Sequence, residues 1–265
     1  MGAKFNIEQI RQFWTEQVRK YGQSPAASWS DTMVIEMEIR HILQYLEDGD
    51  QVLDVGCGNG YSTVQFALQK QVSIRGLDYI PEMIEQARFR ASELADTLLG
   101  TAEFHVGDIT ALDERSDTYD KVVVIRVIIN LMEWSLQEKA LHECARVLKP
   151  GGMLLLSEAT LQGWQQLNRL RIEWGLPAIP MPPFNNYLDQ EQVIEAASFN
   201  LRLIEIDDFS STYYVGTRVL KPLIIKALGA RIDVADPNME WNRLFAQLPA
   251  WGDYGTQKLF VFRRI

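Results

Sequence analysis

Three glycines on alternate positions follow a short apolar run in the stretch VLDVGCGNGY, residues 52–61. Gly56, Gly58 and Gly60 allow positive φ and let backbone amides approach a ligand without an intervening Cβ. Asp54, two residues before the first glycine, would repel a pyrophosphate but would attract an ammonium group. The dinucleotide fingerprint G-x-G-x-x-G needs its third glycine at position 61, which is Tyr61. The turn therefore favours a ligand that places a cation near Asp54 over one that places two phosphates there.

The elements that must position this turn alternate between strands and helices. Apolar runs predict strands at 52–55, 72–77, 103–106, 119–125 and 153–157, and helical periodicity predicts helices at 61–68, 81–94 and 136–148. Near-continuous apolar strands that alternate with helices indicate a parallel sheet covered on both faces. Such sheets bind ligands beyond the carboxyl ends of their strands, where the glycine turn lies.

Further motifs follow the turn in a fixed order. Asp78 ends the second strand in GLDYI, PEMIEQA follows it, GDI lies at 107–109, and RVLKPGG at 146–152 precedes the fifth strand. Together these residues resemble the class I S-adenosylmethionine-dependent methyltransferases, over roughly residues 45–160 and the last two strands. The resemblance implies an α/β Rossmann-like fold with a seven-stranded, mostly parallel sheet, helices on both faces, an antiparallel last strand and substrate-cap insertions.

The resemblance also implies which residues hold S-adenosylmethionine and its product S-adenosylhomocysteine (SAH). Asp78 would accept hydrogen bonds from both ribose hydroxyls. The residues that would contact the methionine portion are Asp54, Gly56, Gly58 and Ile125. Those that would contact the adenine are Tyr79, Ile80, Asp108 and Ile109. Trp29 would close over the cofactor.

Residues outside the core are expected to cover this site. Residues 1–50 contain amphipathic helices at 4–21 and 31–47 and would lie over the cofactor, while 51–160 form the cofactor-binding core. In 161–265, two segments rich in aromatic residues, 161–188 (also rich in proline) and 210–254, show no regular periodicity. We expect them to form a substrate cap, because long irregular segments in compact domains are commonly functional. A helix near 189–198 and the last two strands, at 201–206 and 258–262, make up the rest.

Catalytic candidates should project from the ends of the fourth and fifth strands. Methyl transfer is an in-line displacement that depends on holding the nucleophile in near-attack geometry. An alcohol or amine nucleophile also loses a proton, so a base or a strong hydrogen-bond acceptor would help. Glu158, Asn130 and Arg126 are the favoured residues, with Glu133 and Tyr187 as further candidates. Arg126 could instead bind an anionic substrate through its planar fork.

The composition of the chain limits which binding partners and which cellular compartment we expect. The net charge of -9 and the pI near 5.0 argue against nucleic acid. No apolar run reaches the roughly 18 residues that cross a bilayer, and two cysteines fit a reducing compartment. We therefore expect a cytoplasmic protein, a monomer or homodimer, without membrane contact. No histidine, cysteine and carboxylate spacing suggests a metal site, and each of the three histidines is interpreted as structural or solvated rather than catalytic.

These observations lead to one principal hypothesis and its alternatives. The principal hypothesis is a methyltransferase that acts on an oxygen or nitrogen of a small molecule, such as a saccharide or secondary metabolite. The alternatives are a methyltransferase for a polymer (a glycan end, protein or RNA) and a catalytically silent cofactor-binding scaffold. A nicotinamide oxidoreductase is disfavoured by the glycine spacing and by the carboxylate before it.

Overall fold

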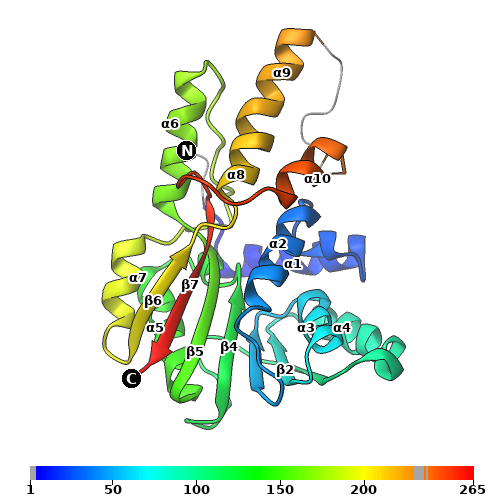
Figure 1. Cartoon of the computed structure of the whole chain (residues 1–265). Coiled ribbons are helices and arrows are strands. Elements are labelled where there is room, and N and C mark those ends of the chain that lie inside the picture. Colours follow the sequence, from blue (N-terminus) through cyan, green and yellow to red (C-terminus); the bar gives the residue numbers. More distant parts are fainter. Residues whose placement is uncertain (1–3, 230–235, 237) are drawn as a thin grey trace.

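The computed structural model describes residues 4–229, 236 and 238–265. At its centre lies a seven-stranded sheet in the order β3-β2-β1-β4-β5-β7-β6 (Figure 1). The first five strands run parallel, and β7 runs antiparallel to both β5 and β6. This topology confirms the predicted fold class. The strands are β1 (Gln51–Val55), β2 (Ser73–Asp78), β3 (Thr101–Val106), β4 (Tyr119–Ile125), β5 (Leu148–Ala159), β6 (Leu201–Asp207) and β7 (Gln257–Arg264).

Helices cover both faces of the sheet. The helices of the N-terminal part and the core are α1 (Ile7–Tyr21), α2 (Thr32–Ile42), α3 (Tyr61–Gln69), α4 (Pro81–Glu93) and α5 (Trp134–Val147). Those after β5 are α6 (Leu161–Glu173), α7 (Gln190–Ala197), α8 (Ser211–Tyr214), α9 (Lys221–Leu228) and α10 (Glu240–Gln247). Single turns of 3₁₀ helix lie at Pro25–Ala27 (η1), Ala95–Thr97 (η2) and Ile128–Asn130 (η3), and a π-helical turn, η4, lies at Val215–Leu220.

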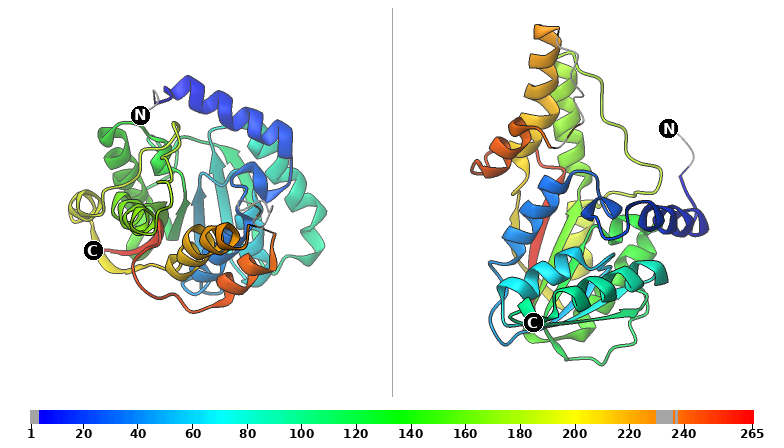
Figure 2. Two further views of the ribbon diagram at one scale, coloured as in Figure 1. Left: turned by 90° about the horizontal axis from the view of Figure 1, so that it is seen from above. Right: turned by 90° about the vertical axis from the view of Figure 1, so that its right-hand side faces the viewer.

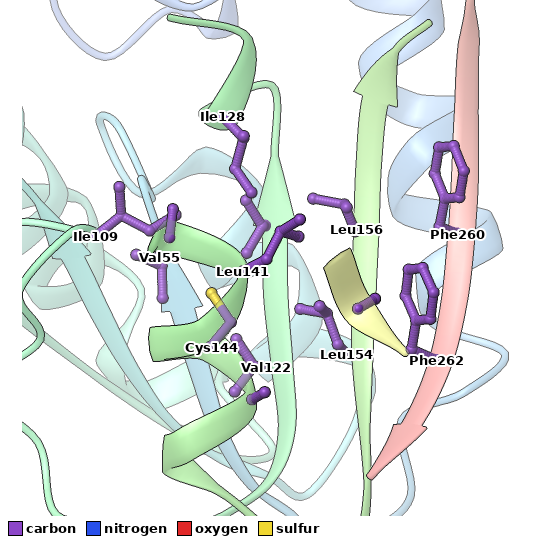
Figure 3. Packing of buried hydrophobic residues seen from close by; sticks show 14 of the residues in the cluster. Val55, Ile109, Val122, Ile128, Leu141, Cys144, Leu154, Leu156, Phe260 and Phe262 are labelled. Atoms are coloured by element: carbon purple, nitrogen blue, oxygen red, sulfur yellow. The ribbon is translucent and has the colours of Figure 1, made fainter. Parts of the chain in front are cut away.

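Two apolar clusters hold the helices on the sheet. On one face, side chains of β4, β5 and β7 pack against α5 and α7. Figure 3 shows Leu141 and Cys144 of α5 facing Val122 and Leu154 of the strands. On the other face, strand residues pack against α2 and α3, with Tyr213 and Tyr214 of α8 in the same cluster. The sheet thereby fixes the loops at the carboxyl ends of its strands, where a site of this fold is expected.

The segments after β5 contain more helix than the sequence predicts. Residues 161–188 begin with α6, and residues 210–254 hold α8, η4, α9 and α10. In Figure 2, α6 and α9 rise side by side above the carboxyl end of the sheet. The prediction of irregular segments was wrong because short helices in both segments pack apolar side chains such as Leu167, Val219 and Phe245 on the core, and polar contacts also join these segments. For example, Trp241 Nε1 donates to the Gly216 carbonyl oxygen at 2.9 Å, and Ser211 Oγ donates to the Trp251 carbonyl oxygen at 2.8 Å.

One strand boundary also differs from the prediction. The sequence Pro150-Gly151-Gly152 predicts a turn before the fifth strand, yet β5 already begins at Leu148, which pairs with Tyr119 of β4. The register shifts between Tyr119 and Lys121, and Gly151 has φ +82°. A bulge of this kind absorbs the turn residues within the strand instead of ending it.

Candidate functional site

The glycine turn after β1 is held against the end of β2. The amides of Gly56 and Cys57 donate to the Leu77 carbonyl oxygen, at 2.6 and 2.9 Å. Gly56 has φ +76°, and a Cβ there would lie 2.1 Å from Val127 Cγ2. At Gly58, with φ +54°, a Cβ would meet nothing within 4 Å. The turn therefore packs tightly on one side and borders open space on the other, as a ligand cradle requires.

A narrow cavity of about 70 Å³, here called the inner cavity, lies beside the turn. The Asp78 carboxylate at its edge accepts hydrogen bonds from Gly58 N at 2.9 Å and from Ile80 N at 2.8 Å. Burial raises the pKa of Asp78 to about 6, although these two bonds oppose the shift. The lining residues are Trp14, Ser28, Gly56, Gly58, Asp78, Tyr79, Ile80, Met83, Ile125, Arg126, Val127 and Asn130.

A second cavity of about 310 Å³, here called the outer cavity, adjoins the first. Trp14, Ser28, Arg126 and Asn130 line both cavities, so the two spaces meet at these side chains. Seven of the described residues that line the outer cavity are aromatic, namely Phe13, Trp14, Tyr21, Trp29, Phe184, Tyr187 and Tyr214. Among the described residues, Arg126 supplies the only formal charge in this wall, and no carboxylate or histidine lines it.

Helix α1 lines both cavities, and the segment 182–187 lines the outer cavity. Phe13 of α1 stacks on Phe184, with ring centroids 4.3 Å apart, and Trp14 Nε1 donates to Asn130 Oδ1 at 3.0 Å. Asn130 Nδ2 in turn donates to Asn185 Oδ1 at 2.8 Å. Beyond α1, Asn59 of the glycine turn donates from Nδ2 to the carbonyl oxygens of Gly22 and Ser24, at 2.9 Å each. Asn130 and Asn59 therefore connect α1 and its neighbouring segments to η3 and to the glycine turn.

Arg126 follows β4 in a left-handed backbone conformation with φ +57°. Its guanidinium forms an ion pair with the fully buried carboxylate of Glu38 from α2, and it lies 5.0 Å from the centroid of the Trp29 ring. Burial lowers the pKa of Arg126 to about 10, which leaves it charged at neutral pH. Its charge is therefore balanced within the protein, which weakens the interpretation that Arg126 binds an anionic substrate.

Glu158, at the end of β5, is completely buried and lines neither cavity. Its Oε1 accepts hydrogen bonds from Val127 N at 2.8 Å and Ile128 N at 2.6 Å, at the start of η3. This contact stabilises the turn that carries Arg126 and Asn130 into the cavities. We infer that Glu158 positions these two residues rather than contacting a substrate itself.

The burial of Glu158 leads to a pH-dependent prediction. Burial raises its pKa from 4.5 to about 8, so the folded state binds this proton more tightly than the unfolded state does. The resulting stabilisation is fully present below pH 4.5 and is lost as the pH rises through 8. We expect Glu158→Gln to reduce the fall in Tm between pH 5 and pH 8.5, measured by thermal unfolding. Glu143, whose pKa is lowered mainly by Arg146, is the control, because Glu143→Gln should leave that fall unchanged. Equal slopes for wild type and Glu158→Gln would contradict the assignment.

Three of the residues predicted to bind the cofactor line neither cavity. Asp54 lies behind the glycine turn, 1% exposed, where Thr63 Oγ1 donates to its Oδ2 at 2.5 Å. Asp108 is exposed and accepts from Thr110 N and Oγ1, and Ile109 is buried in the core under the loop. Their contacts with the cofactor stay predictions. Each of the other predicted cofactor residues lines one cavity, Trp29 the outer cavity and the rest the inner cavity.

Several cavity residues were not among the predicted site residues. Phe13, Trp14 and Tyr21 lie on one face of α1, and the helical spacing of these aromatic residues is a signal that the sequence does carry. Tyr214, Thr256 and Gln257 reach the outer cavity from distant segments that no local motif connects.

The described residues contain neither grouped metal-binding side chains nor long apolar helices. Within residues 4–229, 236 and 238–265, no three or more His, Cys, Asp or Glu side chains are grouped so that they could hold a metal ion. No helix in the same residues combines the length and apolar character needed to cross a bilayer. His41 bonds to Asp207, with Nδ1 and Oδ2 2.5 Å apart, away from both cavities. The structural interpretation of His41 is consistent with this contact.

Known proteins resemble this chain over its core or over nearly its whole length. Residues 46–176 match the family described as "Methyltransferase domain". Methyltransferase GfsG of Streptomyces halstedii is 26% identical over 93% of this chain and 84% of its own length. The 27-O-demethylrifamycin SV methyltransferase of Amycolatopsis mediterranei is 29% identical over 44% of this chain and 41% of its own length.

Two further comparisons concern an RNA-related relative and a solved structure. The bovine protein named probable tRNA methyltransferase 9B is 31% identical over 44% of this chain, which spans only 23% of the bovine protein. The crystal structure of magnesium protoporphyrin IX methyltransferase from Synechocystis PCC 6803, with bound SAH, has a TM-score of 0.63 at 14% identity. It covers 98% of this chain and all of the other. At that identity the likeness establishes the fold.

Proposed function

Because the chain belongs to the class I S-adenosylmethionine-dependent methyltransferases, we propose that it methylates an oxygen or nitrogen of a small molecule held in the outer cavity. The observation that carries this proposal is the shape and lining of the outer cavity. It adjoins the inner cavity through four shared residues, it is covered by α1, and its wall combines aromatic rings with polar side chains. Apolar, partly closed pockets with a few polar groups are typical of small-molecule sites.

The inner cavity fits the cofactor by the chemistry of its donors and acceptors. The Asp78 carboxylate suits two vicinal ribose hydroxyls, Tyr79, Ile80 and Met83 offer apolar surface to the adenine, and Gly58 leaves open space for the methionine portion. When bound, S-adenosylmethionine supplies a methyl group on a positively charged sulfur. Arg126 and Asn130 lie where the two cavities meet and would orient the reactants there, and Ile125 lines the inner cavity next to Arg126.

The outer cavity supports catalysis by positioning rather than by a strong base. The ionisable side chains in its wall are Tyr21, Arg126, Tyr187 and Tyr214. Burial raises the pKa of Tyr187 and of Tyr214, so both hydroxyls stay protonated at neutral pH. Oriented hydrogen bonds to the nucleophile would then carry the main effect. We also propose that the protein is a monomer or homodimer and that it is cytoplasmic, and two buried free cysteines support the location.

A screen with labelled methyl groups tests this function. The protein is incubated with methyl-labelled S-adenosylmethionine and, separately, with metabolite extracts, sugar nucleotides, RNA, glycans and proteins. We expect label in low-mass products only. Label confined to a polymer would establish the alternative that the tRNA-related relative raises, which the net charge of -9 and the aromatic cavity argue against. SAH binding without any transfer would establish the scaffold alternative.

A further inference from the structure

Gln257, the first residue of β7, is an uncharged side chain that the structure fixes unusually firmly. It is only 1% exposed, it pairs with Ala159 of β5, and both residues line the outer cavity. Its Nε2 donates to Glu38 Oε1 at 2.9 Å and to Ser157 Oγ at 3.2 Å. A carboxylate accepts hydrogen bonds only, so Glu38 dictates which end of the amide faces it.

Glu38 is itself held in place from two sides. Ser157 Oγ donates to its Oε1 at 2.9 Å, and the Arg126 guanidinium pairs with its Oε2. The carboxylate therefore neither rotates freely nor carries an unbalanced charge. This arrangement turns the carbonyl oxygen of Gln257, Oε1, away from Glu38.

Gln257 Oε1 has no hydrogen-bond partner within residues 4–229, 236 and 238–265. Among the described residues, the fully buried side-chain polar atoms without a hydrogen-bond partner are Tyr79 Oη, Glu158 Oε2 and Asp208 Oδ1. Because Gln257 Oε1 has no partner but is not one of these atoms, it keeps some exposed surface. Gln257 is almost fully buried and lines the outer cavity. Its exposed amide oxygen is therefore directed toward that cavity. A carbonyl oxygen left unpaired at such a site is a binding group for a ligand that donates a hydrogen bond.

We propose that Gln257 Oε1 accepts a hydrogen bond from the O–H or N–H of the group that receives the methyl, an inference that rests on the function proposed for the outer cavity. An amide oxygen does not remove the proton, so Gln257 contacts and orients the nucleophile without acting as a base. The O-methylated product of an alcohol has no hydrogen to donate. The same contact therefore makes the unmethylated acceptor bind more tightly than its product. The product has no hydrogen to donate, so it leaves Gln257 Oε1 without a hydrogen-bond partner.

Two small fluorinated probes test this contact without methyl transfer. 4-Fluorobenzyl alcohol donates a hydrogen bond, and its methyl ether does not. Their dissociation constants for the SAH-saturated protein are measured by ¹⁹F NMR. In the wild type we expect the alcohol to bind about three- to tenfold more tightly than the ether, the range of one neutral hydrogen bond. In Gln257→Met, which keeps side-chain length and volume close to those of glutamine, this preference should shrink to less than twofold.

Gln69→Met is the matched control. It makes the same exchange at an exposed glutamine of α3 that lines neither cavity, and it leaves Gln257 in place. It should keep the preference for the alcohol. SAH affinity, measured by calorimetry, should stay within about twofold of wild type in both variants, which shows that they fold.

The outcomes separate the contact from the function. A preference retained in Gln257→Met, no preference in the wild type, or no binding of either probe overturns the assignment of Gln257. A preference that depends on Gln257, together with no methyl transfer to any acceptor, would support the contact and overturn the proposed function instead.

Discussion

Asp78→Ala is expected to weaken SAH binding by about 100-fold or more. Two hydrogen bonds from ribose hydroxyls to a carboxylate are worth about 1.5–3 kcal/mol each, and each 1.4 kcal/mol is a tenfold change in affinity. The variant also removes the acceptor that holds Gly58 N and Ile80 N, so the glycine turn loses part of its order. Titration calorimetry with SAH measures the change directly.

The pH dependence gives this prediction a second, independent readout. Burial raises the pKa of Asp78 to about 6, and the ionised form is the stronger acceptor. Wild-type affinity for SAH should therefore fall as the pH drops below 6, and Asp78→Asn should show no such fall. Asp96, which is exposed on η2, provides the control, since Asp96→Ala should bind SAH as the wild type does. If Asp78→Ala and Asp96→Ala bind SAH equally, the ribose assignment is wrong.

Arg126→Ala is expected to destabilise the folded protein by about 3–5 kcal/mol. The substitution leaves the Glu38 carboxylate, which has no exposed side-chain surface, without its counter-charge. At about 2–4 °C for each kcal/mol, Tm should fall by about 10 °C. Chemical unfolding with urea gives the free energy of unfolding, and a thermal scan gives Tm.

A second substitution distinguishes a structural role of Arg126 from a purely catalytic one. Adding Glu38→Gln to Arg126→Ala removes the stranded charge, and most of the lost stability should return. Arg19, whose side chain is 70% exposed in its pair with Glu82, is the matched control, because Arg19→Ala should cost less than about 1 kcal/mol. An Arg126→Ala protein with wild-type stability but little turnover would show that Arg126 acts on the reactants alone.

The core could be predicted from the sequence because its signals are local. The glycines of the turn, the acidic residue that ends β2 and the apolar strands each depend on a few neighbouring residues, and the seven-stranded sheet follows their order. Arg126 and Asn130 could be placed at the cavities because they directly follow β4. The same reasoning placed Glu158 at the end of β5 but could not reveal that its carboxylate faces the amides of η3.

The remainder of the site depends on contacts between distant segments. Glu38 lies on an amphipathic helix 88 residues before Arg126, and no spacing rule joins the two. Gln257 reaches the outer cavity only because β7 inserts antiparallel between β5 and β6. Tyr214 lies where α8 passes into the π-helical turn η4, a local widening that the sequence does not signal but that occurs frequently at functional sites.

Asn130 couples the ligand affinities of the two cavities. Its side chain lines both cavities and is bonded at once to Trp14 of α1 and to Asn185 of the segment 182–187. A ligand in one cavity that fixes the Asn130 amide takes up the entropy cost of ordering this side chain. A ligand that then binds in the other cavity has less of that cost to meet. By thermodynamic linkage the effect is reciprocal, so the affinity for the acceptor is defined only at a stated occupancy of the cofactor site.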